Sequence, residues 1–145
     1  IKEVGDFNHG FTYSGHPTCA AAALENIRIL EDEGLVERVR DDIGPYFTKA
    51  WQSLADHEIV GEAVNVGLMG GLQLAVDKTT RQRFAKPDDV GIVVRNHCLE
   101  NGLVMRATGD RMLASPALTI SHSEVDRIIE TLRKGLDHLR DTIKV

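Results

Sequence analysis

Residues 101–132 read NGLVMRATGDRMLASPALTISHSEVDRIIETL, and this stretch decides how the chain folds. Two short apolar runs, 103–106 and 111–114, lie on either side of Thr108-Gly109-Asp110. Gly and Asp favour turns, so we predict two strands that are joined at that point. Ser121-His122-Ser123-Glu124 then has the form of a capping box, in which the serine and glutamate side chains each bond the other residue's backbone N–H. A helix is predicted to begin there.

The predicted C-terminal helix has apolar residues every third or fourth position, which is the spacing of a stripe buried on one side. Ile120 and Val125 flank the capping box and are placed to form a hydrophobic staple across it. The buried face is expected to continue from Val125 with Ile128, Ile129, Leu132, Leu136, Leu139 and Ile143.

Upstream, the apolar residues of 63–77 alternate as they do in strands. The alternating residues are Val64, Val66 and Leu68, followed by Leu72, Leu74 and Val76. We interpret Met69-Gly70-Gly71, which lies between the two sets, as a bulge or tight bend. Residues 77–87 are predicted to form a charged surface loop, and 90–98 a short helix that ends at Asn101-Gly102.

Two helices are predicted before these strands. Pro17 suits the first turn of a helix and Gly34 its C-terminal cap. A second helical stripe covers 36–54, with a kink or short break expected at Gly44-Pro45. The order of the elements indicates an α/β fold, with an α+β small domain in which helices cover a small mixed or antiparallel sheet. The stripe of the first helix is Ala20, Ala23, Leu24, Ile27 and Leu30.

The composition is that of one globular domain, with 145 residues of which 42% are hydrophobic and 27% charged. A net charge of -5 argues against a nucleic-acid partner. No apolar run approaches the roughly 18 residues of a membrane span. Cys19 and Cys98 have no metal or CxxC spacing, so we expect reduced thiols in a cytoplasmic protein. Because the chain begins with Ile1, we also expect truncation or processing.

Residues 8–17 contain glycines and hydroxyl side chains just before a helix, where donors can bind a phosphate. Because no standard phosphate-loop pattern is present, a polar surface turn is the alternative. His9 and His16 lack metal-site spacing, so no metal is expected. Cys98 is assigned to core packing rather than to a nucleophile paired with His97.

Arg106 is the second candidate site residue, because it ends an apolar run and precedes a glycine turn. Its guanidinium can bind a carboxylate through two parallel hydrogen bonds. The alternative is an ion pair within the chain, with Asp110 or Glu100.

Three blocks of sequence together resemble the class III, or omega-type, pyridoxal-phosphate-dependent aminotransferases. They are HGFTYSGHP with the alanine-rich helix after it, VGLMGGLQL at 66–74, and the stretch 101–132. The resemblance runs along nearly the whole chain in the same order.

This resemblance implies the C-terminal domain of the aspartate-aminotransferase-like fold. Residues 1–16 would end the cofactor domain, and 17–145 would form the connecting helix and the C-terminal small domain. Thr12, with Phe11 beside it, would bind the phosphate of pyridoxal 5'-phosphate in the neighbouring subunit. Arg106 would receive the substrate carboxylate, with Tyr13 also at the substrate site.

The implied activity is transfer of an amino group from an amine or omega-amino acid to a keto acid such as pyruvate, by a homodimer or dimer of dimers. The family's lysine motif precedes the FTYSGHP block, so we expect the catalytic lysine outside this chain and the chain alone to be inactive. The family's Pro-Pro-Leu is Pro116-Ala117-Leu118 here, which is expected to loosen that turn. The chain's lysines are Lys2, Lys49, Lys78, Lys86, Lys134 and Lys144.

Two alternatives remain at the level of sequence. One is a decarboxylase or aminomutase of the same family, which would differ in an upstream substrate pocket. The other is a non-catalytic interaction module that kept the small-domain fold. The identity of the amino donor is not indicated by any residue.

Overall fold

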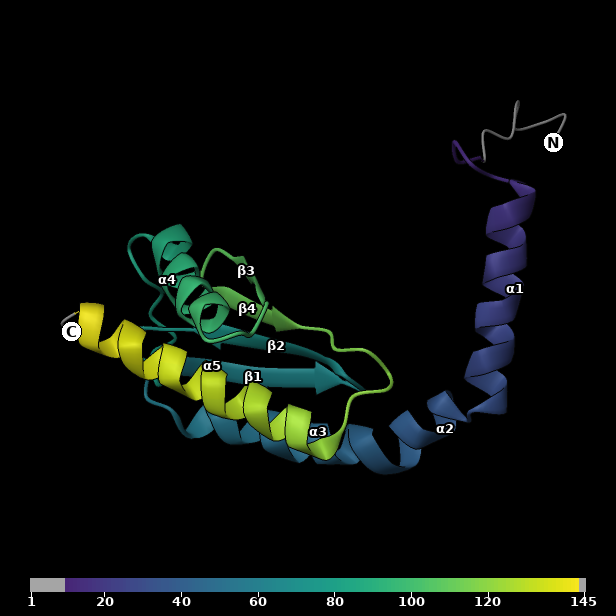
Figure 1. Cartoon of the computed structure of the whole chain (residues 1–145). Helices are drawn as coiled ribbons and strands as arrows, with labels where there is room; N and C mark the ends of the chain where they lie inside the picture. Colours follow the sequence, from purple (N-terminus) through teal and green to yellow (C-terminus); the bar gives the residue numbers. More distant parts are fainter. Residues whose placement is uncertain (1–9, 144–145) are drawn as a thin grey trace, which may run out of the picture. The chain divides into compact units, whose positions relative to one another are not determined.

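The structure is a computed structural model that describes residues 10–143, without the side chains of 87–89 and 143 (Figure 1). The chain divides into two compact units, Ile1–Gly34 and Leu35–Val145, and each is described by itself. Helix α1, Pro17–Asp32, belongs to the first unit. The expected boundary between a cofactor domain and a small domain after residue 16 stays a prediction.

The first helix forms as the sequence predicts. Pro17 occupies its first turn, and the His16 side chain caps it by accepting a hydrogen bond from the Cys19 N–H. Its end is marked by Gly34 in a left-handed conformation with φ of 59°, which an L side chain rarely adopts. The predicted apolar stripe is not buried within its own unit, since Leu24 is 69% exposed.

The second helical run is continuous and not broken at Gly44-Pro45. It consists of α2 (Leu35–Arg38), the π-helical turn η1 (Val39–Ile43), α3 (Gly44–Gln52) and the 3-10 turn η2 (Ser53–Asp56). The Gly44 N–H bonds the Val39 carbonyl, so the wider turn brings Pro45 to the start of α3, where it breaks no helical bond. A Cβ on Gly44 would lie 2.2 Å from the Val39 oxygen, which explains the glycine.

The second unit is built on one antiparallel sheet with the strand order β1-β2-β4-β3. The strands are β1 (Val60–Val66), β2 (Met69–Leu74), β3 (Arg106–Thr108) and β4 (Arg111–Ala114). Helix α4 (Pro87–Glu100) precedes β3, and α5 (His122–Ile143) ends the chain. In Figure 1, α5 lies between α3 and α4 along the sheet. This confirms a small antiparallel sheet covered by helices.

The prediction of a bulge or tight bend at Met69-Gly70-Gly71 is wrong. The chain turns at Gly67-Leu68, where Gly67 has φ of 53°, and Gly70 and Gly71 are regular strand residues. A Cβ on Gly70 would lie 2.5 Å from the Trp51 ring, so this position accommodates Trp51. The bulge lies instead in β1, between Val60 and Glu62.

The third strand also begins later than expected. Gly102 turns the chain with φ of 78°, and the Leu103 N–H bonds the Cys98 carbonyl at the end of α4. Residues 103–105 therefore complete the helix end, and β3 starts at Arg106. The turn at Gly109 is confirmed, with φ of 61°.

The capping box of α5 is confirmed in full. The Ser121 N–H donates to the Glu124 carboxylate at 2.8 Å, and the Glu124 N–H donates to the Ser121 hydroxyl at 3.3 Å. Ile120 and Val125 are both buried, as a hydrophobic staple requires. Arg38 fixes the preceding segment by donating to the carbonyls of Leu118 and Ile120 at 2.7 and 2.6 Å. The expected loosening of the turn at residues 116–118 stays a prediction.

The core lies between the helices and the inner face of the sheet. Phe47 and Trp51 of α3 stack with their ring centroids 5.3 Å apart, and the Trp51 Nε1–H donates to the Gly71 carbonyl at 3.2 Å. The outer face of the sheet has no cover among the described residues of this unit. Val64 and Val66, which alternate as predicted, lie on that face and are 53% and 78% exposed. Fully buried side chains of the core include Ile43, Leu54, Leu72, Leu74, Met112, Leu132, Leu136 and Leu139.

Candidate functional site

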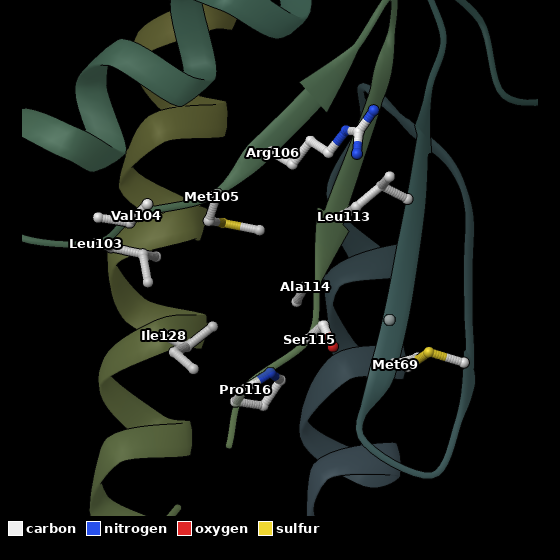
Figure 2. Close-up of a pocket in the computed structure, with 11 residues that line it drawn as sticks. Met69, Leu103, Val104, Met105, Arg106, Leu113, Ala114, Ser115, Pro116 and Ile128 are labelled. Carbon is white, nitrogen blue, oxygen red and sulfur yellow. The ribbon is translucent and has the colours of Figure 1, made fainter. Parts of the chain in front are cut away.

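Arg106 is an unpaired guanidinium at the rim of an apolar hollow. It begins β3 opposite Leu113 of β4, and within the described residues its side chain makes no hydrogen bond or ion pair. The hollow has a volume of about 700 Å³. Figure 2 shows Arg106 extending toward Leu113, with Met69 of the neighbouring strand on the same face.

The lining of this hollow is apolar except for a few polar groups and one charged side chain. Val104, Met105 and Ile128 form its opposite wall, and Ser115 and Pro116 close one end. Among its described lining residues, Arg106 is the only ionised one. Arg106 itself is exposed, so its guanidinium is accessible to an anion from solvent.

The alternative ion pair of Arg106 does not form. Asp110 has no exposed side-chain surface and is bound by Arg83, whose Nε and Nη2 donate to its two oxygens at 2.8 and 2.7 Å. The Arg83 hydrogen bonds hold the pKa of Asp110 below its ordinary value, against the opposing effect of burial. Glu100, the other proposed partner, has no ion pair within the described chain. Arg106 is thus left available for a ligand.

The phosphate-loop candidate is an exposed turn before α1. The Ser14 N–H donates to the Phe11 carbonyl at 2.9 Å, and the Ser14 hydroxyl accepts from the Phe11 N–H at 3.0 Å. Gly15 has φ of 75°, which completes the turn. The Thr12 side chain has no hydrogen bond to any described residue, so its hydroxyl is free to donate outward.

The aromatic residues on either side of Thr12 are exposed, Phe11 by 78% and Tyr13 by 74%. Tyr13 contacts the His16 ring edge-on, with centroids 6.1 Å apart. His16 caps α1, which gives it a structural role in the HGFTYSGHP block. His9 lies outside the described residues. The turn belongs to the first unit and Arg106 to the second, so a shared site that contains both stays a prediction.

The described part of the chain contains no metal site, and its buried cysteine is unreactive. No group of three or more His, Cys, Asp or Glu residues there could hold a metal ion. Cys98 is fully buried, and burial raises its pKa to about 11, so the thiol stays neutral and packs in the core as predicted. No described helix has the length and apolar character needed to cross a membrane.

Two features of the site had no signal in the sequence. Arg83 lies 27 residues before Asp110, and no local spacing links them. Met69 and Leu113 come from strands distant in sequence, and only the sheet register brings them onto the face where Arg106 lies. The R-x-x-G-D block, residues 106–110, holds a free arginine and a buried aspartate that do not pair with each other.

The sequence matches the model of the family described as aminotransferase class-III over residues 2–136. It is 52% identical over 137 residues to a putrescine--pyruvate aminotransferase of Pseudomonas aeruginosa, which covers 94% of this chain and 30% of the relative. It is 36% identical over 135 residues to a mitochondrial gamma aminobutyrate transaminase of Solanum lycopersicum, which covers 93% of this chain and 26% of that protein.

Solved structures agree with these sequence relatives. A transaminase from ancestral reconstruction superposes with a TM-score of 0.86 at 41% identity, over 97% of this chain and 31% of that one. The omega transaminase of Pseudomonas jessenii in complex with PMP gives a TM-score of 0.86 at 32% identity, over 99% of this chain and 31% of that one. The chain therefore spans about 30% of the length of the curated relative from Pseudomonas aeruginosa.

Proposed function

This chain belongs to the class-III aminotransferase family, and on that premise we propose that it supplies the carboxylate-binding and phosphate-binding parts of an enzyme that moves an amino group from an amine or omega-amino acid to a keto acid. The observation that carries the proposal is Arg106, an unpaired guanidinium beside an apolar hollow. A keto acid is an anion with a short carbon chain, and this hollow offers a partner for each part.

The carboxylate of the keto acid bonds the guanidinium of Arg106 through two parallel hydrogen bonds in this proposal. Its carbon chain then lies toward Leu113 and Met69. An amine donor without a carboxylate makes no use of Arg106. The two half-reactions differ in their dependence on this one residue.

Members of this family depend on pyridoxal phosphate, which when bound accepts the amino group from the donor and passes it to the acceptor. The exposed turn fits one part of this cofactor, because the free Thr12 hydroxyl can donate to its phosphate, and Phe11 stands beside it. In keeping with the resemblance, we propose that Thr12 reaches the cofactor of a second copy in a homodimer. Tyr13 then lies on the substrate side of the same interface.

Two of the described lysines are already engaged by groups of the chain itself. Lys134 is paired with Glu130 at 2.6 Å, and Lys78 donates to the Ala55 carbonyl at 3.2 Å. No lysine lines the hollow of Arg106 among the described residues. In keeping with the resemblance, we propose that the lysine that binds the cofactor lies in another segment of the enzyme.

A chimera tests the function directly. Residues 10–143 would replace the matching part of the Pseudomonas aeruginosa putrescine--pyruvate aminotransferase, whose identity of 52% favours a compatible fit. We expect the chimera to bind cofactor and to form alanine from pyruvate, with putrescine as the first donor to test. A folded, cofactor-loaded chimera that makes no alanine would contradict the proposal, and a product that has lost carbon dioxide or moved its amino group would indicate the decarboxylase or aminomutase instead.

A further inference from the structure

A second hollow of about 230 Å³ lies in the same unit, and it is lined by residues of β1, β2, β4 and the loop after β2. It shares no lining residue with the hollow of Arg106. Arg81, Arg83 and Arg111 line it together, against one carboxylate, that of Glu62. This cluster is unexpected in a chain whose net charge is -5, and the proposed aminotransferase activity makes no use of it.

Arg111 is held in place by a neutral partner. Its Nε donates to the Gln73 side-chain oxygen at 2.8 Å, and the Gln73 amide nitrogen donates in turn to the Leu74 carbonyl at 3.0 Å. Both terminal nitrogens of Arg111 remain without a hydrogen bond to the described residues. The strand position and the glutamine therefore orient the guanidinium without neutralising it.

Arg83 is held by an acidic partner but keeps one donor. Its bonds to Asp110 use Nε and Nη2, which leaves Nη1 unengaged by any described group. Even when Asp110 is counted with Glu62, three positive charges face two negative ones. The hollow therefore keeps a positive charge.

Arg81 is placed by a tightly bonded turn. The Asp77 carboxylate accepts from the N–H groups of Thr79 and Thr80 at 2.7 and 3.0 Å, and the Gln82 N–H donates to the Asp77 carbonyl at 3.0 Å. Within this turn Arg81 has φ of 58°, a conformation that normally favours glycine. Its guanidinium has no partner in the described part of the chain.

We propose that this hollow binds a phosphate dianion, either the free ion or the phosphate group of a monoester. Guanidinium groups match phosphate oxygens in geometry and remain charged at all physiological pH values. The volume is below the range of roughly 300–1,000 Å³ that drug-sized ligands occupy, so it suits a small anion. A dianion meets three guanidinium groups here, whereas a neutral molecule of the same size would leave them unpaired.

The test is a titration of the 145-residue chain with inorganic phosphate. The NMR chemical shifts of the amides of Gly61, Gln73 and Arg111 monitor binding, and sodium chloride at equal ionic strength is the reference. We expect saturable shifts at these amides. Arg111→Gln and Arg81→Gly should each weaken phosphate binding about tenfold or more, since each removes hydrogen bonds to a charged group. Glycine suits the φ of residue 81, so that variant should stay folded, and the same spectra report its fold.

The matched control is Arg95→Gln on α4, because Arg95 bonds only its neighbour Asn96 and does not line the hollow. Its phosphate affinity should equal that of the unmodified chain. A parallel titration with glycerol 3-phosphate identifies the source of the anion: tighter binding than inorganic phosphate indicates a monoester, and weaker binding indicates the free ion. Absence of saturable shifts with both probes, or equal weakening in Arg95→Gln, would overturn the proposal.

Discussion

Arg83 and Asp110 form a bidentate ion pair in which the carboxylate is fully buried and the guanidinium is 59% exposed. The hydrogen bonds from Arg83 lower the pKa of Asp110 from its ordinary value of 3.8. A carboxyl group whose pKa is lowered on folding stabilises the protein above that ordinary value, and this stabilisation is lost as pH falls through the lowered pKa. The ion pair therefore makes the stability of the β3–β4 turn fall when the solution becomes acidic.

We predict that Asp110→Asn is less stable than the unmodified chain at neutral pH, and that the difference shrinks as pH falls below 3.8. The asparagine has no charge for Arg83 to bind and no proton to gain, so its stability depends less on pH. Urea denaturation at a series of pH values measures both chains. Asp56→Asn is the control, because Asp56 is exposed and has no hydrogen bond to a described residue. A stability difference between Asp110→Asn and the unmodified chain that does not change with pH would contradict the linkage.

The second prediction concerns two adjacent glycines in β2. A Cβ on Gly70 would lie 2.5 Å from the buried Trp51 ring, so Gly70→Ala should lower the free energy of unfolding by about 1–3 kcal/mol through overpacking. Gly71→Ala is the matched control, since its Cβ would meet Val64 and Leu113 at ordinary contact distances of 3.8 and 3.9 Å. Chemical denaturation compares the two, and equal losses would show that strand conformation, not Trp51, determines the glycine at residue 70.

The elements that could be predicted from the sequence are those with local causes. The capping box at Ser121 and Glu124, the turn at Gly109 and the first turn at Pro17 each depend on residues a few positions apart. Gly70 was misassigned because its reason, the ring of Trp51, lies 19 positions earlier in the chain and is close only in the fold.

The candidate site divides in the same way. Arg106 could be proposed as a carboxylate binder from its residue type and its place beside a turn, and that role stays a prediction. The absence of an ion pair at Arg106 could not be predicted from the sequence. Asp110 lies only four positions away, but it is bound by the distant Arg83. The apolar lining from Met69 and Leu113 depends on strand register, which sequence spacing does not specify.

The third prediction is that the 145-residue chain alone neither transaminates nor binds pyridoxal phosphate covalently at one defined lysine. The described lysines are exposed, and none lines the hollow of Arg106. Incubation with the cofactor, borohydride reduction and mass spectrometry of the peptides measures this. Scattered substoichiometric labelling is the expected result, whereas one stoichiometric adduct together with turnover would show that the chain carries its own catalytic lysine.

The fourth prediction concerns Thr12 in the chimera with the Pseudomonas aeruginosa enzyme. Thr12→Ala removes a hydroxyl donor to a doubly charged phosphate, and hydrogen bonds to charged groups contribute about 1.5–3 kcal/mol. Cofactor affinity should fall by roughly one to two powers of ten, as measured by equilibrium titration of the apoenzyme. Thr18→Ala, which removes an exposed hydroxyl in the first turn of α1, should leave the affinity unchanged. Equal affinity in both variants would remove Thr12 from the phosphate site.

The last prediction separates a substrate-binding role of Arg106 from a structural one. In the chimera, Arg106→Ala should lower kcat/KM for pyruvate by about a hundredfold or more, because a charge-assisted bidentate pair is lost. The half-reaction with putrescine, followed alone by cofactor absorbance, should change little, since this donor has no carboxylate. Arg106→Lys keeps the charge without the planar fork, so it should rescue only part of the pyruvate reaction.

The same variants also test whether Arg106 stabilises the fold. Arg106 has no ion pair within the described residues, so Arg106→Ala should leave the melting temperature of the 145-residue chain close to that of the control Arg95→Ala. Loss of both half-reactions alike, together with a lowered melting temperature, would mean that Arg106 anchors the sheet. Loss confined to the keto acid, in a protein of unchanged stability, would instead support binding of the substrate carboxylate by the guanidinium.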